Sequence, residues 1–232
     1  MKKTFADLKS RHFLQEIVNN FFSKHELNLI SQIMTACYSN ANKNIANGPL
    51  AGLRCPAGKK ARPFVYYLEV EAKIAQLCTQ GRLHCKAEWK QIPKNGDIYL
   101  VLRKNVLGYD VRVTINQTEY LTKVSRPAEY RKSLNHNTQL SLFDDKETVG
   151  SPTIYLELNH GYEGSIPKFI VLGLPTEDGT WIVKKVLSLA LNTSTMKEDY
   201  TEFWNGKQTK SNISFTPEEL VNNTSKKEEK NR

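Results

Sequence analysis

The chain has 232 residues, a formal net charge of +9 at pH 7, 39% hydrophobic and 25% charged residues, a composition typical of a soluble globular protein that buries its own core. No apolar run approaches the length that crosses a bilayer, so a membrane-spanning protein is not indicated. The charged N-terminus is followed by no apolar signal segment, and we therefore expect a cytoplasmic protein without a membrane partner.

Four cysteines are spread along the chain without a C-x-x-C pair. Cys78 and Cys85 are the nearest two, with His84 beside them, but zinc sites usually have more closely paired ligands. We therefore expect reduced, partly buried thiols and no metal ion or other cofactor.

Basic residues are concentrated in the middle of the chain. Residues 50–132 hold 16 basic and 7 acidic side chains, whereas residues 133–232 hold 11 basic and 14 acidic ones. A clustered positive charge is the electrostatic footprint of a protein that binds a polyanion, although the solvated face of any basic protein has a similar composition. The distribution favours contact with nucleic acid, and DNA is the expected partner.

Residues 1–45 are predicted to form a helical hairpin. Apolar residues from Leu14 to Phe21 recur at spacings of three and four, and Ser23 to Glu26 has the S-x-x-E form of a capping box at the start of a second helix. The second helix has almost no basic residues to meet phosphates, so the pair is not expected to read DNA as a helix-turn-helix. Their apolar faces are expected to pack on the core.

The stretch NGPLAGLRCPAGKKAR follows the predicted hairpin, loses periodicity and is rich in Gly and Pro, which indicates a loop. It lacks the G-x-x-x-x-G-K-[ST] order of a phosphate-binding loop. Its basic side chains are candidates for contact with a nucleic-acid backbone, and they are Arg54, Lys59, Lys60 and Arg62.

Residues 63–124 are predicted to form a mainly antiparallel sheet. The period changes to two at Pro63 and is clearest in RLHCKAEWK, after which come the turn PKNGD and the strands IYLVLR and YDVRVTI. One face of this sheet is apolar and the other basic, as antiparallel sheets often cover only one side. The basic face supplies further candidates for nucleic-acid contact, which are Arg82, Lys86, Lys90, Arg103 and Arg112.

A polar connection, residues 125–152, follows the predicted sheet, and connections of this length are either functional or disordered. Apolar segments resume over residues 153–191 as the final strands. Residues 1–205 then form a single α+β domain, in which an N-terminal helical hairpin packs on a mainly antiparallel β-sheet and a long polar connection precedes the last strands. The polar tail, residues 206–232, is expected to be largely disordered.

The connection contains one isolated apolar cluster, QLSLF, with polar and charged flanks. Such a cluster either folds onto its own domain or is bound in the groove of a partner. QLSLF resembles the short peptide through which bacterial DNA polymerases, mismatch-repair proteins and many phage or plasmid proteins bind the bacterial sliding clamp, and it matches that motif at all five positions. The matching residues are Gln139, Leu140, Ser141, Leu142 and Phe143.

The resemblance implies a role for each end of the peptide. Gln139 would hydrogen-bond in a small polar pocket of the clamp, and Leu142 and Phe143 would fill its hydrophobic groove. Burial of these two apolar side chains contributes roughly 3–6 kcal/mol before ordering costs, which is compatible with a replaceable contact of micromolar affinity.

A metal-dependent nuclease, of the restriction type, is the alternative from another class of function. Such enzymes gather carboxylates and a lysine around a metal ion, and LEVEAKI has the E-x-K pattern but lacks the preceding aspartate. A second set of carboxylates, in YDVRVTI and YLELNHG, lacks the lysine. The catalytic candidates are Glu69, Glu71, Lys73, Asp110 and Glu157, and Mg²⁺ would be needed only under this alternative.

No nucleophile motif, Rossmann fingerprint or Cys/His grouping indicates another chemistry, so the sequence favours a binding protein over an enzyme. We expect an accessory protein of bacterial or phage DNA metabolism that binds the sliding clamp through residues 139–143 and DNA through its basic central segment. A DNA-binding regulator that does not use the clamp is a further alternative.

Overall fold

The chain divides into two compact units, Met1–Ala190 and Leu191–Arg232. All the elements described below belong to the first unit. The predicted tail, residues 206–232, and the stretch that resembles a clamp-binding peptide, residues 139–143, lie outside the described residues. The computed structural model describes residues 5–92, 95–126, 128, 130–134, 153–161, 164–176 and 178–189, with side chains from residue 11 onward.

Helices precede a six-stranded sheet in the described part of the first unit, so the fold class is α+β, as predicted. None of the helices in these ranges is long and apolar enough to cross a membrane. The helices are α1 Phe5–Phe21, α2 Lys24–Asn47 and α3 Arg62–Thr79, and two 3₁₀ turns, η1 Ala51–Arg54 and η2 Gly58–Lys60, connect α2 to α3.

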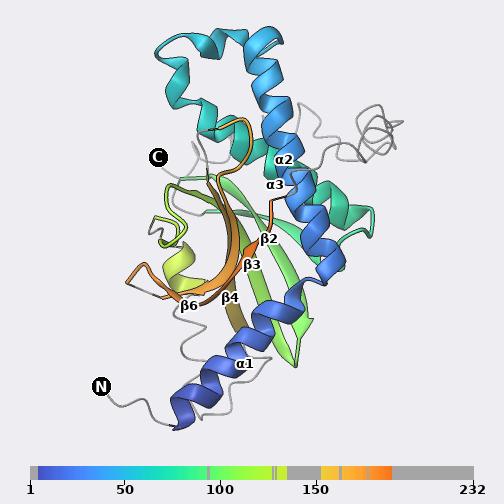
Figure 1. The fold of residues 1–232 in the computed structure, drawn as a ribbon, viewed down its shortest axis with the longest axis vertical. Coiled ribbons are helices and arrows are strands. Elements are labelled where there is room, and N and C mark those ends of the chain that lie inside the picture. The colour runs from blue at the N-terminus through green and yellow to red at the C-terminus, as the bar shows by residue number, and fades with distance from the viewer. Residues whose placement is uncertain are drawn as a thin grey trace, which may run out of the picture. The chain divides into compact units, whose positions relative to one another are not determined.

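The boundary between α1 and α2 is the capping box expected from the sequence. Ser23 Oγ accepts a hydrogen bond from the Glu26 backbone N–H at 3.2 Å, and Glu26 Oε2 accepts one from the Ser23 backbone N–H at 2.7 Å. The two helices follow one another with a change of direction at Ser23, and α2 then packs along α3 (Figure 1). The helices that lie side by side are therefore α2 and α3.

Residues 62–79 form a helix, so the prediction of a strand beginning at Pro63 is wrong, and the sheet begins only at Lys86. Alternation of apolar residues between Phe64 and Val70 covers only two helical turns, and Phe64 itself is exposed. A short alternating run does not separate a strand from a helix. The helical period shows in the buried apolar residues of α3, which are Tyr66, Val70, Ile74 and Leu77.

The six strands lie in the sheet in sequence order. All neighbours are antiparallel except β3 and β4, which are parallel. A parallel pair requires a crossover connection, and residues 119–152, which include the predicted polar connection, supply it. The strands are β1 Lys86–Gln91, β2 Ile98–Val106, β3 Tyr109–Thr118, β4 Thr153–Gly161, β5 Ile170–Pro175 and β6 Trp181–Leu187.

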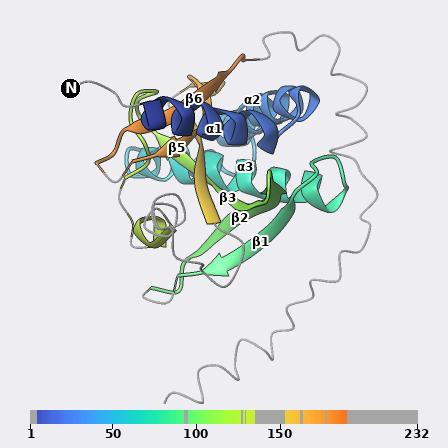
Figure 2. The ribbon, with the colours of Figure 1, turned by 90° about the horizontal axis from the view of Figure 1, so that it is seen from below.

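The helices cover one face of the sheet (Figure 2). α1 packs on β2, β5 and β6, and α3 packs on β1 and β3. The hydrophobic core lies between these layers, and polar side chains of the strands gather on the opposite face. This face is called the open face below because α1, α2 and α3 do not cover it, although the chain after β3 covers its centre. The buried apolar residues that the central strands direct toward the helices include Leu100, Leu102, Val111, Val113, Leu156, Leu158, Ile170 and Leu172.

One carboxylate ties the start of α2 to the segment before β1. Glu26 Oε1 accepts a hydrogen bond from the His84 backbone N–H at 2.6 Å and lies 3.0 Å from His84 Nδ1, while its other oxygen is held by Ser23. The residue is only 2% exposed. Burial by itself would raise the pKa of Glu26, but the hydrogen bonds from His84 and Ser23 lower it to about 2.

Replacement of Glu26 by glutamine should lower the free energy of unfolding by about 2 kcal/mol at neutral pH, because hydrogen bonds to a charged acceptor are lost. The folded-state pKa of Glu26 is depressed from 4.5 to about 2, so this contribution is present above pH 4.5 and is lost as the pH falls toward 2. Urea unfolding of both proteins at a series of pH values measures it.

The matched control is Glu16→Gln on α1, where the carboxylate is half exposed and lies 3.7 Å from His12. This change should have little effect on stability. Equal stability of the Glu26→Gln and Glu16→Gln variants at neutral pH would contradict the role given to Glu26.

Candidate functional site

Four of the basic residues that were predicted to contact nucleic acid lie on the open face of the sheet. Lys86 on β1 pairs with Arg103 on β2, and Arg103 pairs with Arg112 on β3, so these three side chains lie in register across adjacent strands. Lys90 projects from the same face of β1, because residues an even number apart on a strand share a face. These four residues are called the basic row below.

Two carboxylates partly neutralise the basic row. Asp110 accepts hydrogen bonds from Arg103 Nε at 2.5 Å and from Arg112 Nη2 at 2.9 Å, and Glu88 lies 3.8 Å from Arg103 and 3.7 Å from Lys90. Burial would raise the pKa of Asp110, but the two arginines hold it below its usual value. Asp110 is therefore an ion-pair partner, and the row of four cations keeps an excess of positive charge.

The remaining basic candidates are not part of this row. The 3₁₀ turns that carry several of them pack against α2 and α3, beyond the end of α2 in Figure 1. Arg54 Nε and Arg62 Nε donate to backbone carbonyls of their own loop, those of Ala51 and Leu53. These candidates are Arg54, Lys59, Lys60 and Arg62 around the turns and Arg82 in the turn before β1.

The E-x-K candidates lie on α3 rather than on the expected strand, and they do not converge. Residues two apart on a helix project in different directions. Lys73 Nζ donates to Gln76 Oε1 at 3.1 Å, and Glu69 Oε1 accepts from Asn40 Nδ2 at 3.5 Å, whereas Glu71 is buried. In the described ranges no three His, Cys, Asp or Glu side chains are placed to hold a metal ion.

Cys78 and Cys85 are free, partly buried thiols whose Sγ atoms lie 3.5 Å apart. His84, their neighbour in the sequence, directs Nδ1 toward Glu26. The three residues therefore do not converge as ligands of one metal ion.

A buried polar cluster occupies the centre of the open face, where β3 and β4 pair. The carboxylate of Glu157, 2% exposed, accepts hydrogen bonds from Ser125 N at 2.9 Å, Ser125 Oγ at 2.7 Å and Asn159 Nδ2 at 2.9 Å. Tyr155 Oη donates to it at 3.2 Å and lies 2.7 Å from Thr114 Oγ1. Glu157 therefore fixes the chain that follows β3 onto β4, and protein donors occupy both of its oxygens.

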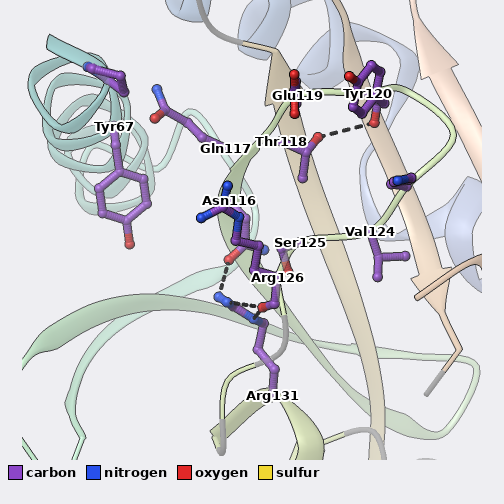
Figure 3. A pocket seen from close by; sticks show the side chains of 12 residues that line it. Tyr67, Asn116, Gln117, Thr118, Glu119, Tyr120, Val124, Ser125, Arg126 and Arg131 are labelled. Carbon is purple, nitrogen blue, oxygen red and sulfur yellow. Dashed lines mark hydrogen bonds between the residues drawn. The ribbon is translucent and has the colours of Figure 1, made fainter. Parts of the chain in front are cut away.

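A cavity of about 650 Å³ opens beside this cluster at the carboxyl end of β3 (Figure 3). Its walls come from the end of β3, from the chain that follows up to Arg131, and from the first turns of α3. Arg131 Nη1 donates to Asn116 Oδ1 at 2.9 Å, and Arg131 Nε donates to Arg126 O at 3.1 Å. Ligands often bind outside the carboxyl ends of parallel strands, in concave sites with a few placed polar groups.

A second buried carboxyl group, that of Glu71, is hydrogen-bonded to Tyr67, which lines the same cavity. β2 stops pairing with β3 at Val101, and just beyond this point the Leu100 N–H donates to Glu71 Oε1 at 3.1 Å. Tyr67, which lines the cavity, donates its Oη proton to the same oxygen at 2.6 Å. Burial raises the pKa of Glu71 to about 7.

The chain matches no protein-family model, no curated protein and no solved structure. Its function is therefore inferred from its own residues and their geometry.

Sequence reasoning missed the residues that line the cavity, such as Asn116, Gln117 and Arg131. Of its candidates, Glu157 and Glu71 lie nearby and contact the lining residues Ser125 and Tyr67. The available signal was the alternation of polar residues in both YDVRVTINQT and TIYLELNHG, because two such strands paired side by side place their polar residues on one face.

Glu71→Gln should raise the free energy of unfolding by about 1–3 kcal/mol near pH 8, because glutamine keeps an acceptor for Tyr67 and Leu100 without the buried charge. The folded-state pKa of Glu71 is raised from 4.5 to about 7. Its stabilising contribution is therefore present below pH 4.5 and is lost as the pH rises through 7. Urea unfolding should show a small difference between variant and wild type near pH 4.5 and the largest difference near pH 8.

Glu69→Gln is the control on the same helix, because Glu69 is less buried than Glu71. It should change the free energy of unfolding less than Glu71→Gln does near pH 8, because the Glu69 side chain is not fully buried. A Glu71→Gln variant that is less stable than the wild type near pH 8 would refute this account of the buried carboxyl group.

Proposed function

We propose that the chain is an accessory protein of bacterial or phage DNA metabolism that binds the sliding clamp through residues 139–143. The observation that carries the proposal is the match of QLSLF to the clamp-binding peptide at all five positions. Its position in the chain supports the proposal, because these residues fall in the crossover between β3 and β4 and are not needed for any described strand. Evolution can therefore adapt a short peptide in such a connection to the groove of a partner without changing the described strands. The proposed location is the cytoplasm, in agreement with these proposed partners.

DNA is the proposed second partner, and the basic row is the proposed contact surface. Lys86, Arg103 and Arg112 lie on three adjacent strands, and strands are about 4.8 Å apart, so their cations span about 10 Å. Asp110 orients both arginines without cancelling the charge of the row. Contacts with phosphates give an affinity that is independent of base sequence and falls as salt rises.

Replacement of both Leu142 and Phe143 by alanine should abolish retention of the protein on immobilised clamp, because the two apolar anchors are removed. The melting temperature should stay unchanged, because under the proposal these side chains contact the clamp and not the protein's own core. Pull-down and thermal unfolding measure the two quantities.

The matched control replaces Asn135 and Asn137, in the polar flank, by alanine, and this variant should be retained like the wild type. Full retention of the Leu142→Ala, Phe143→Ala variant would sink the proposal. Loss of retention together with a lower melting temperature would also count against it, because the cluster would then be part of the protein's own core.

Replacement of Lys86 and Arg103 by alanine should weaken binding to a double-stranded DNA probe. Two phosphate contacts are lost, so the slope of log affinity against log salt should fall in magnitude by about 2. Fluorescence anisotropy at several salt concentrations measures the slope. Lys184→Ala, a lysine on the strand β6 at the opposite edge of the sheet, is the control, and an unchanged slope in the double variant would argue against the basic row.

DNA binding without clamp retention would instead indicate the DNA-binding regulator. The nuclease alternative has less support, because Glu69, Glu71 and Lys73 do not converge on α3. Incubation of DNA with the wild type and Mg²⁺ tests it directly, and we expect no cleavage.

A further inference from the structure

The cavity at the carboxyl end of β3 is lined by more cations than anions. Lys123, Arg126 and Arg131 face it from the chain after β3, and Glu119 is the acidic residue of its described lining. Within the described part of the chain, no carboxylate forms an ion pair with any of these three cations. Their charge therefore favours an anionic ligand.

Neutral acceptors hold Arg131 in place. Its Nη1 donates to Asn116 Oδ1 at 2.9 Å and to Tyr130 Oη at 2.5 Å, and its Nε donates to Arg126 O at 3.1 Å. The guanidinium carbon also lies 4.9 Å from the centroid of the Tyr130 ring. Arg131 Nη2 also donates to Arg126 O at 2.5 Å. These contacts fix the direction of the guanidinium group without an opposing charge, so Arg131 attracts a phosphate or carboxylate mainly through its positive charge.

Gln117 adds a neutral donor at the wall of the cavity. Its Nε2 is buried and forms no hydrogen bond of normal geometry among the described residues, although its side chain interacts weakly with the Tyr38 hydroxyl. Its side chain extends from the end of β3 toward α3, where Tyr67 lies (Figure 3). A buried donor without a well-formed hydrogen bond is costly, and an oxygen atom of a ligand would supply one.

Tyr120 provides an aromatic surface beside the cations. The residue is 51% exposed, and Lys123 Nζ lies 5.4 Å from the centroid of its ring. Nucleic-acid bases stack on aromatic rings of this kind while nearby cations meet the backbone phosphate. The cavity volume of about 650 Å³ is in the range of sites that hold small organic ligands.

We propose that this cavity binds a nucleotide, with its phosphate at Lys123, Arg126 and Arg131 and its base on Tyr120. The ligand is either a free mononucleotide or the phosphorylated end of a single DNA strand, because both present the same phosphate, sugar and base. None of the four residues of the basic row lines this cavity, and the proposal does not depend on the function proposed above.

Calorimetric titration of the full chain with deoxyadenosine monophosphate, deoxyadenosine, and a short single-stranded oligonucleotide with or without a 5′-phosphate tests the proposal. A phosphorylated ligand should bind about tenfold or more tightly than its unphosphorylated counterpart. Replacement of Lys123 and Arg126 by alanine should weaken this binding by about tenfold or more. Both residues are exposed, so the melting temperature should not change. Lys132→Ala, an exposed lysine next to Arg131 but outside the cavity lining, is the matched control and should bind like the wild type.

Binding of deoxyadenosine monophosphate would identify a free nucleotide as the ligand, and binding of only the 5′-phosphorylated oligonucleotide would identify a strand end. Both outcomes support the proposal. It is overturned if neither phosphorylated ligand binds, if the 5′-phosphate makes no difference, or if the Lys123→Ala, Arg126→Ala variant binds like the wild type. Loss of phosphate-dependent binding in the Lys86→Ala, Arg103→Ala variant would also overturn it, because the ligand would then occupy the basic row.

Discussion

The parallel pairing of β3 with β4 is the constraint on which the rest of the structure depends. Strands that are consecutive in the chain and run parallel cannot be joined by a hairpin, so the chain leaves the sheet after Thr118 and returns at Thr153. The same pairing brings the carboxyl ends of both central strands to one edge of the sheet. The polar cluster and the cavity both lie in this region, and the crossover carries the sequence that resembles a clamp-binding peptide.

The polar cluster positions the residues around it. Buried polar groups destabilise a fold unless they are satisfied, and the Glu157 carboxylate is satisfied by Ser125, Asn159 and Tyr155. Two of its hydrogen bonds hold the backbone and side chain of Ser125, whose neighbours in the sequence include Lys123 and Arg126. Glu157 was a catalytic candidate on sequence grounds, but its contacts make it a positioning residue for the loop that supplies cations to the cavity.

Local patterns in the sequence were sufficient to predict the features that depend on residues close together in the chain. The capping box at Ser23 and the alternation that places Lys86, Arg103 and Arg112 on one face both follow from residues a few positions apart. The helix α3 was missed, because the alternation after Pro63 fits two helical turns as well as a strand. A period of two assigns side chains to faces but does not say which strands are neighbours or whether they run parallel. The cavity depends on that missing information, because Tyr67, Asn116 and Arg131 come from separate segments.

The register of the strands and the length of the crossover are under different constraints in this fold. A shift of β4 by one residue relative to β3 would turn Tyr155, Glu157 and Asn159 toward the helices and bring their apolar neighbours to the open face. Residues can be added to the crossover after Leu134 at a cost in loop-closure entropy that grows slowly with length. The part up to Arg131 is constrained further, because Glu157 holds Ser125 and Arg131 donates to Asn116. Related chains are expected to differ more in residues 135–152 than in residues 119–131, so a partner-binding peptide can be gained or lost within one lineage while the residues that line the cavity are kept.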